Sequence, residues 1–262
     1  MNIHNKWGLL NSLISILNQA DEDAGKTVLA KYFLSNFGSL DNVNIYDAAE
    51  QCYTTRAAIR RFCQSLGYDN FKALKEEARE YVEEGYRYYS TSENVEDYPA
   101  YLAKQIAEMA EDCNANMNGK TGKIADLIYR SGMVVFLVSD IYSQHCSDFQ
   151  KQMIVNGKMI RIVGQKFDDN QLLQTLTSED LLFVVSTGGF FERVIRDLIS
   201  AFPCGKILMT SRHSREYTEI YDEVLYLCSH DLGKERTVYH MYAVEYCLNL
   251  IASAYQKRYK GK

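Results

Sequence analysis

Arginine and small polar residues share one side of a helix-length segment between Thr54 and Tyr68. Apolar residues recur there at i, i+3, i+4 and i+7, the spacing of one buried helix face. These apolar residues are Ile59, Phe62, Cys63 and Leu66. The opposite face suits insertion into a DNA groove, whereas the alternative is an ordinary surface helix with solvated arginines. We expect DNA contacts from Thr55, Arg56, Ala57, Arg60, Arg61 and Gln64, with Lys72 and Lys75 on phosphates.

A second short helix is expected immediately before this segment. It has the same apolar spacing, and Asn44 stands where an N-cap residue belongs. Only Tyr53 and Thr54 separate the two apolar stripes, so the helices must cross steeply, as in a helix-turn-helix. Thr55 is the expected N-cap of the second helix, and Gly67 its left-handed C-cap. The apolar residues of the first helix are Ile45, Ala48, Ala49 and Cys52.

Further helices are expected to support this pair. Two amphipathic segments cover residues 8–18 and 23–37, joined by the acidic run 21–23. Another helix starts at Phe71, with Asp69 or Asn70 as its cap, and extends to about residue 88.

Positive charge is local in this chain. The 262 residues have a formal net charge of -5, so any DNA contact must rest on a local patch. Residues 54–75 hold five basic residues against Asp69 alone, a net charge of +4.

Composition excludes several classes of protein. Seven cysteines without clustered spacing argue against a disulfide framework and a zinc site, and indicate a reducing cytoplasm. No apolar run approaches a membrane span of roughly 20 residues. Nothing in the sequence indicates a cofactor or a bound metal.

The second half of the chain has a different pattern, in which short apolar runs alternate with helical stretches. This predicts a parallel sheet covered by helices on both faces, followed by a closing helix from Glu235 to Tyr259. The fold class is therefore α/β overall: an all-α helix-turn-helix domain (1–80), a helical extension and linker (81–100), and a doubly wound domain with a five-stranded parallel sheet (101–262). The predicted strands are Val134 to Val138, Met159 to Val163, Leu181 to Val185, Lys206 to Thr210 and Glu223 to Leu227.

Two loops at the carboxyl ends of the predicted strands carry small polar residues. Ligands of such sheets bind at this edge, where loops and helix N-termini converge. Free hydroxyls beside two glycines can cradle a phosphate, although such residues are commonly turn formers only. We expect ligand contacts from Ser139, Tyr142 and Ser143 after the first strand and from Ser186, Thr187, Gly188 and Gly189 after the third.

The helix-turn-helix segment carries a family signature, which consists of Arg61-Phe62-Cys63, Leu66-Gly67-Tyr68, Phe71 and Leu74-Lys75. It resembles the N-terminal domain of RpiR-type bacterial transcriptional regulators over roughly the first 80 residues. The resemblance implies a DNA reader joined to a sugar isomerase (SIS) domain that senses a metabolite and dimerises. The implied partners are a double-stranded DNA operator, a phosphosugar or other small metabolite, and further copies of the chain in a homodimer or homotetramer.

The second half resembles a SIS domain in strand order and in the turn Gly157-Lys158, but its loops depart from the family pattern. The Gly-x-Gly-x-Ser loop of the family falls on Val138, Asp140 and Tyr142, and its Ser-x-Ser-Gly-x-Thr loop falls on Val185, Thr187, Gly188 and Phe190. Asp140 would repel a phosphate, and Phe190 removes a donor. Three interpretations stay open: a degenerate phosphosugar site, a site for a less anionic ligand, and a pocket that only dimerises.

The sequence therefore predicts a regulator of sugar metabolism or uptake genes and not an enzyme. One rival is a sugar-phosphate isomerase, which needs a general acid–base pair. Its candidates are His145, His230, His240 and Glu235, each of which is also explained as a surface, packing or helix-start residue. The other rival is a partner-binding module without a DNA role.

Overall fold

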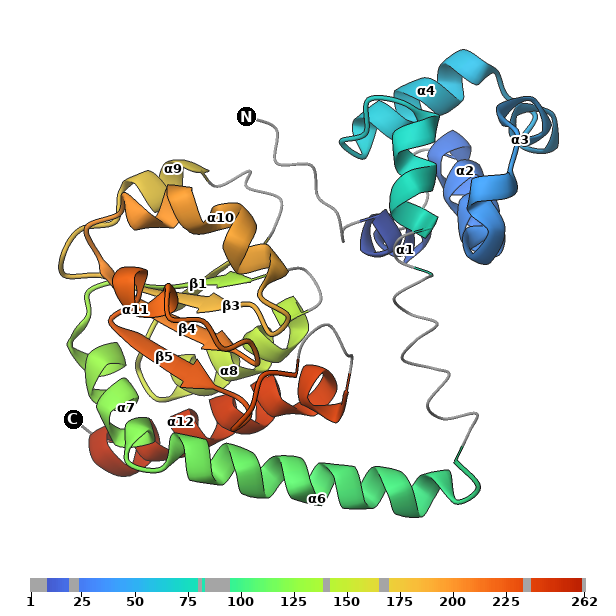
Figure 1. Cartoon of the computed structure of the whole chain (residues 1–262). Helices are drawn as coiled ribbons and strands as arrows, with labels where there is room; N and C mark the ends of the chain where they lie inside the picture. The colour runs from blue at the N-terminus through green and yellow to red at the C-terminus, as the bar shows by residue number, and fades with distance from the viewer. Residues whose placement is uncertain are drawn as a thin grey trace. The chain divides into compact units, whose positions relative to one another are not determined.

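A computed structural model describes residues 9–18, 24–79, 82, 95–138, 142–164, 170–232 and 237–260. The chain divides into two compact units, Met1–Thr91 and Ser92–Lys262 (Figure 1). Most of the predicted linker, the acidic run 21–23, and the candidate residues Ser139, Asp140 and Glu235 lie outside the described residues. Among the described residues, no helix is long and apolar enough to cross a membrane.

The first unit is helical. Its elements are α1 (Leu9–Asn18), α2 (Ala24–Ser35), the 3₁₀ helix η1 (Phe37–Asn42), α3 (Ile45–Gln51), α4 (Arg56–Ser65) and a further helix described over residues 71–79. Within the described residues the predicted helices are confirmed, except that the second ends at Ser35; the predicted extension of the last helix to about residue 88 lies largely outside those residues. The chain tightens into η1 because Gly38 is a poor helix former and Ser39 has non-helical dihedral angles (φ -135°, ψ 22°).

Aromatic packing holds α4 in the first unit. Phe33 of α2 is fully buried. Its ring stacks on Phe71, with centroids 5.4 Å apart, and meets Phe62 of α4 at 5.7 Å. Ile59 and Cys63 of α4 are fully buried in the same cluster. Since such burial stabilises each large apolar side chain by about 1.5–3 kcal/mol, this face of α4 is fixed inward.

The second unit is built on a parallel sheet. Its strands are β1 (Val134–Val138), β2 (Ile160–Val163), β3 (Leu181–Val185), β4 (Gly205–Thr210) and β5 (Glu223–Tyr226). Within the described residues the sheet is five-stranded, with the order β2-β1-β3-β4-β5 and every pairing parallel. The prediction of a five-stranded parallel sheet is confirmed, with strand ends within one residue of those expected.

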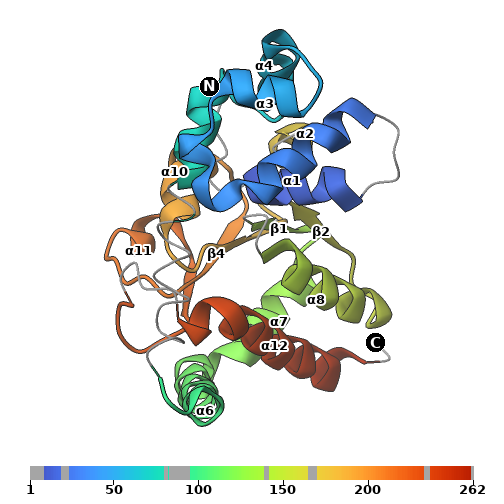
Figure 2. The same cartoon turned by 90° about the vertical axis from the view of Figure 1, so that its right-hand side faces the viewer.

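Helices cover both faces of this sheet (Figure 2). Val134, Phe136 and Val138 face one core, and Val135 and Leu137 face the other, because side chains alternate along a strand. The first core is covered by α6 (Tyr98–Met117), α7 (Lys120–Arg130), α8 (Ser143–Val155) and α12 (Val244–Tyr259). The second is covered by α9 (Asn170–Gln174), α10 (Phe190–Ser200) and α11 (Tyr217–Ile220). The predicted doubly wound arrangement is confirmed.

The closing helix is not regular throughout. A π-helical turn, η3 (Tyr239–Ala243), leads directly into α12. All seven cysteines of the chain are buried free thiols. Burial raises the pKa of Cys63 and of Cys146 to about 12, so both remain protonated and unreactive at neutral pH.

Asp112 of α6 ties this helix to the loop after β5. Its carboxylate accepts hydrogen bonds from Ser229 N and Tyr239 Oη, both at 3.0 Å, and from the Ser229 hydroxyl. Burial alone would raise the pKa of Asp112, but these hydrogen bonds outweigh it and lower the pKa. Asp112 therefore stabilises the folded unit as a carboxylate.

Replacing this carboxylate tests the link. Asp112→Asn is expected to lower the free energy of unfolding of the second unit at pH 7 by about 1–3 kcal/mol, as measured by urea denaturation. Because the folded pKa is lowered, the contribution of Asp112 is present above its unfolded pKa of about 3.9 and is lost as the pH falls through the folded pKa. The difference between wild type and variant should therefore shrink in acid. The control is Glu111→Gln, at an exposed neighbouring position on α6; an equal effect of both variants would contradict the assignment.

Candidate functional site

The exposed face of α4 is the candidate nucleic-acid interface. Its predicted contact residues are all exposed, whereas Ile59, Phe62 and Cys63 on the opposite face are buried. The predicted division of α4 into an apolar and an arginine-bearing face is thus confirmed. The exposed residues are Thr55, Arg56, Ala57, Arg60, Arg61 and Gln64.

Local hydrogen bonds set the ends of the two helices. Asn44 Oδ1 accepts from Tyr46 N at 2.9 Å to cap α3, and Thr55 Oγ1 accepts from Ala58 N at 3.1 Å to cap α4. Gly67 follows α4 in the left-handed conformation (φ 90°). These predicted caps are confirmed, and they position the start of α4 directly after the turn that leaves α3.

The arginines of α4 differ in their surroundings. Arg56 Nη1 donates to Tyr46 Oη at 2.8 Å, and its guanidinium lies over the Tyr46 ring at 4.6 Å from the centroid. These contacts restrain the arginine before any partner binds. Arg60 and Arg61 form no ion pair with any residue that the structure describes, so their charges are available to an anionic partner.

The two predicted phosphate contacts beyond α4 have different roles. Among the described residues, Lys72 forms only an exposed ion pair with Glu76, at 3.8 Å. Such an exposed pair contributes little to stability. Lys75, in contrast, donates through Nζ to the carbonyl oxygens of Asp41 at 2.7 Å and Val43 at 3.0 Å. Lys75 satisfies carbonyl groups at the end of η1 with two of its three donors, and its predicted contact with a phosphate stays a prediction.

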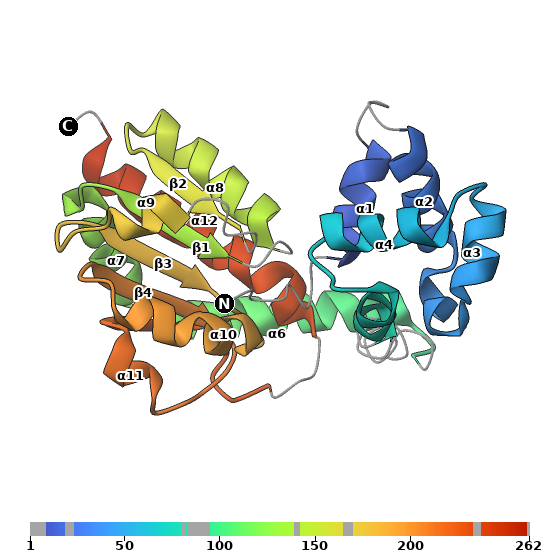
Figure 3. The ribbon, with the colours of Figure 1, turned by 90° about the horizontal axis from the view of Figure 1, so that it is seen from above.

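The candidate ligand site lies at the carboxyl edge of the sheet, between β1 and β3. From this point α8 runs along one face of the sheet and α10 along the other (Figure 3). Such a switch point leaves a crevice where ligands bind in doubly wound folds. Tyr142 precedes α8 and Thr187 follows β3, and their hydroxyls hydrogen-bond to each other at this edge. Both side chains are buried.

The hydroxyls after β3 are not free, contrary to the sequence-based expectation. Ser186 Oγ accepts a hydrogen bond from Glu192 N at 3.0 Å, inside the first turn of α10, and Thr187 is bonded to Tyr142. Ser143 is half-buried at the start of α8, and Gly188 is exposed. Tyr142 and Thr187 thus lie together, and the Thr187 and Ser186 hydroxyls are hydrogen-bonded within the protein; the ligand contacts expected from the two loops stay a prediction.

Gly189 has a steric role beside the loop. It has φ 73°, and a Cβ there would lie 2.8 Å from Arg212 Cγ and 3.1 Å from Tyr217 Oη. Only glycine therefore allows Arg212 to pack against the start of α10.

Residues after β4 belong to the same edge and were missed in the sequence. Ser211 N donates to Thr187 O at 3.0 Å, which places Ser211 beside the loop after β3. Its Oγ is buried and has no hydrogen-bond partner among the described residues. Arg212 pairs with Asp231 at 3.3 Å, and His240 Nε2 lies 4.0 Å from where a Cβ on Gly188 would stand. The polar run after the fourth predicted strand was the signal that could have revealed them.

Glu192 and Arg196 form a largely buried ion pair within α10. Glu192 is fully buried, and Arg196 donates to both of its carboxylate oxygens, at 2.9 and 2.8 Å. Tyr221 Oη donates to the same carboxylate at 3.3 Å. Burial, followed by the charge of Glu192, raises the pKa of the Tyr221 phenol. With its oxygens engaged in this way, Glu192 is a structural group rather than a free base.

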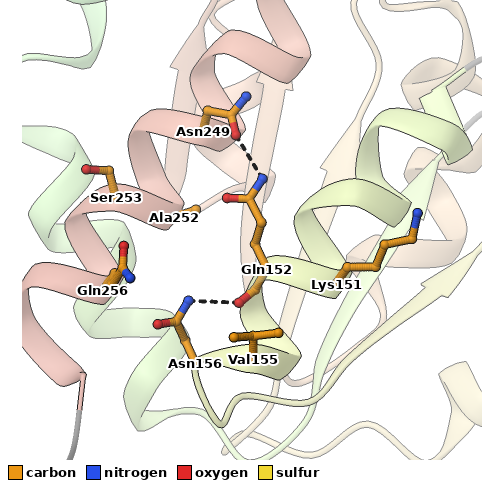
Figure 4. Close-up of a pocket in the computed structure, with 8 residues that line it drawn as sticks. All are labelled: Lys151, Gln152, Val155, Asn156, Asn249, Ala252, Ser253 and Gln256. Atoms are coloured by element: carbon orange, nitrogen blue, oxygen red, sulfur yellow. Dashed lines mark hydrogen bonds between the residues drawn. The ribbon is translucent and has the colours of Figure 1, made fainter.

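A separate open groove lies between α8 and α12 (Figure 4). It has a volume of about 430 Å³. Across the groove, Gln152 Nε2 donates a hydrogen bond to Asn249 Oδ1 at 2.9 Å. Because α8 starts at the carboxyl edge of the sheet, this groove beside its final residues lies toward the amino edge. The groove therefore contains none of the predicted ligand residues.

Comparison with known proteins gives only distant likeness. No family model and no curated protein matches the chain. Vibrio vulnificus NanR in complex with ManNAc-6P is 16% identical with a TM-score of 0.47, over 96% of this chain and 92% of that chain. An RpiR transcription factor from Sphaerobacter thermophilus (sugar isomerase domain) is 15% identical with a TM-score of 0.48, over 60% and 90%. A hypothetical protein from Methanococcus jannaschii is 14% identical with a TM-score of 0.47, over 60% and 89%. Similarity at this level assigns neither a family nor a function to the chain.

The unpaired hydroxyl of Ser211 gives a stability prediction. An unsatisfied buried hydroxyl costs about 1–3 kcal/mol, so Ser211→Ala should raise the free energy of unfolding of the ligand-free protein by about 1 kcal/mol. Ser186→Ala is the matched comparison, and it should lower that free energy by about 1 kcal/mol because it removes the bond to the first turn of α10. Urea denaturation measures both. Equal destabilisation by the two variants would show that Ser211 Oγ has a partner in the folded state.

Proposed function

We propose that this protein is a DNA-binding transcriptional regulator of sugar metabolism or uptake genes. The observation that carries the proposal is the exposed face of α4, on which Arg60 and Arg61 have no ion-pair partner among the described residues, while the other face is buried in an aromatic core. Four residues, 52–55, separate α3 from α4, a turn of the length found in a helix-turn-helix, and in that motif the second helix enters the major groove. A homodimer would present two such helices to symmetric half-sites.

The second unit is proposed to sense a phosphosugar or a related small metabolite. Support comes from the topological switch point between β1 and β3, from the buried Ser211 hydroxyl beside it, and from Arg212 and His240 at the same edge. Arginine and hydroxyl donors favour an anionic ligand. Such a ligand would have to replace the bond between Tyr142 and Thr187 to reach the Thr187 hydroxyl, which argues for a degenerate site rather than a wide pocket.

The rival isomerase function has weaker support. Glu192 is engaged by Arg196 and Tyr221. His145 lies 3.2 Å from Glu245 Oε2, and Nδ1 of His240 accepts from Thr237 N at 3.3 Å. We therefore propose a sensor without turnover, which predicts unchanged sugar phosphate after prolonged incubation with the protein.

Arg61→Ala tests the DNA-reading face. Loss of this side chain should weaken binding to the DNA flanking the gene of the protein by about 1–3 kcal/mol without unfolding the first unit. Fluorescence anisotropy of a labelled duplex measures the affinity, and circular dichroism checks the fold. Wild-type binding should also fall steeply with salt, because phosphate contacts release counterions.

The control variant is Arg215→Ala, which removes an exposed arginine from the second unit. It changes the net charge by the same amount and should leave affinity unchanged. If Arg61→Ala binds as wild type does, the assigned face of α4 is wrong. If neither variant differs and wild-type binding is independent of salt, the DNA-binding proposal itself fails.

A titration panel of sugar phosphates tests the sensing site. At least one should raise the thermal midpoint of the wild-type protein, since a ligand that binds only the folded state stabilises it by about 2.7 kcal/mol at 100 times its dissociation constant. Ser211→Ala should reduce that shift while leaving the ligand-free protein folded. The absence of any shift with the whole panel would contradict the phosphosugar proposal and favour a domain that only dimerises.

A further inference from the structure

Tyr53 occupies a position where the backbone favours glycine. It lies in the turn between α3 and α4 with φ 49°, in the left-handed region that bulky residues rarely adopt. Backbone strain of this kind persists where the surrounding structure imposes it, and it clusters at functional sites.

The turn is a Schellman cap, and the chain repeats the motif. After α3, Thr54 N donates to Ala49 O at 2.8 Å and Tyr53 N donates to Glu50 O at 3.1 Å. After α4, the same two bonds join Tyr68 N to Cys63 O at 2.9 Å and Gly67 N to Gln64 O at 3.0 Å. In this motif the left-handed position is usually glycine. The cap after α4 follows that rule and the cap after α3 does not.

Among the described residues of the first unit, none buries the Tyr53 side chain. It is 98% exposed, the most exposed large hydrophobic residue described. It makes no side-chain hydrogen bond, ion pair or ring contact with any described residue. Tyr53 therefore combines a strained backbone with a side chain whose exposure gains no burial energy, and a contact with a partner would offset that cost.

The position of Tyr53 identifies the partner. It stands two residues before Thr55, the N-cap of α4, and on the same short segment as Arg56, whose guanidinium is already held over Tyr46. In a helix-turn-helix the first helix crosses the sugar-phosphate backbone and the N-terminal residues of the second contact bases, so the turn that joins them, with Tyr53, lies next to that backbone. Tyrosine hydroxyls are among the groups that donate to phosphate oxygens in protein–DNA complexes.

We infer that Tyr53 binds DNA by donating its phenolic O–H to a backbone phosphate next to the N-terminus of α4. This inference rests on the proposed DNA-binding function and adds a contact to it. Tyr53 positions the duplex and does not read bases, so its contribution is the same for any sequence. The strain at φ 49° is then a stability cost retained for binding.

Two substitutions separate the contact from the strain. Tyr53→Phe keeps the ring and the strained backbone and removes only the hydroxyl. Tyr53→Gly removes both the side chain and the strain. Gly67→Ala is the matched control. It introduces backbone strain into the Schellman cap after α4, where φ is 90° and no atom lies within 4 Å of the added Cβ. It leaves the proposed Tyr53 contact unchanged.

The affinity of the full-length protein is measured by fluorescence anisotropy for the duplex flanking its gene and for a scrambled duplex of equal length. Both Tyr53 variants should bind both duplexes about fivefold more weakly, the loss of one hydrogen bond, and Gly67→Ala should bind as wild type does. In native-state hydrogen exchange, Tyr53→Gly should slow exchange of the α3 and α4 amides about fivefold, and Gly67→Ala should accelerate it.

The inference thus predicts that Tyr53→Gly raises the stability of the first unit and lowers its affinity for DNA. If wild type binds DNA and Tyr53→Phe keeps full affinity, the hydroxyl contact is overturned while the DNA-binding function stands. If wild type binds neither duplex, the proposed function fails, and the inference fails with it.

Discussion

Burial of one face of α4 against the aromatic cluster around Phe33 is the constraint on which the first unit depends. Phe33 stacks on Phe71 and meets Phe62, so α4 can neither rotate nor leave without opening that core. Every residue on the other face is consequently turned to solvent. The arginines are exposed because of this packing and not because of their own interactions. The aromatic core of this unit therefore determines which side chains of α4 are exposed to a partner.

Topology has the corresponding role in the second unit. Because β1 and β3 are neighbours while α8 and α10 cover opposite faces, Tyr142 before α8 meets Thr187 after β3. The polar groups there are mostly bonded to one another: Ser186 to the start of α10, and Thr187 to Tyr142. Ser211 is the exception, with its buried hydroxyl unpaired among the described residues. A signal molecule would thus compete with internal hydrogen bonds, which suits a switch better than a permanently open pocket.

The sequence predicts the elements well and the partners of individual polar groups poorly. Strand β1 is evident because every residue from Val134 to Val138 is apolar and buried, and the caps of α3 and α4 are evident because capping is local. Lys75 donates hydrogen bonds to carbonyl oxygens more than 30 residues away in the sequence. Ser211 lies beside the loop after β3 because β3 pairs with β4. Tyr53 was overlooked because its turn type follows from dihedral angles and not from residue type. Local patterns thus predict secondary structure, whereas site contacts depend on long-range packing.

The central claim is that α4 reads DNA as one of a symmetric pair of helices. Hydroxyl-radical footprinting of the full-length protein on the DNA flanking its gene tests this most directly. The account predicts two protected segments related by symmetry, with centres one helical turn of about 10–10.5 base pairs apart or a multiple of that spacing. Protection should disappear at high salt. A uniform cleavage pattern at saturating protein, or protection that does not depend on sequence, would contradict it.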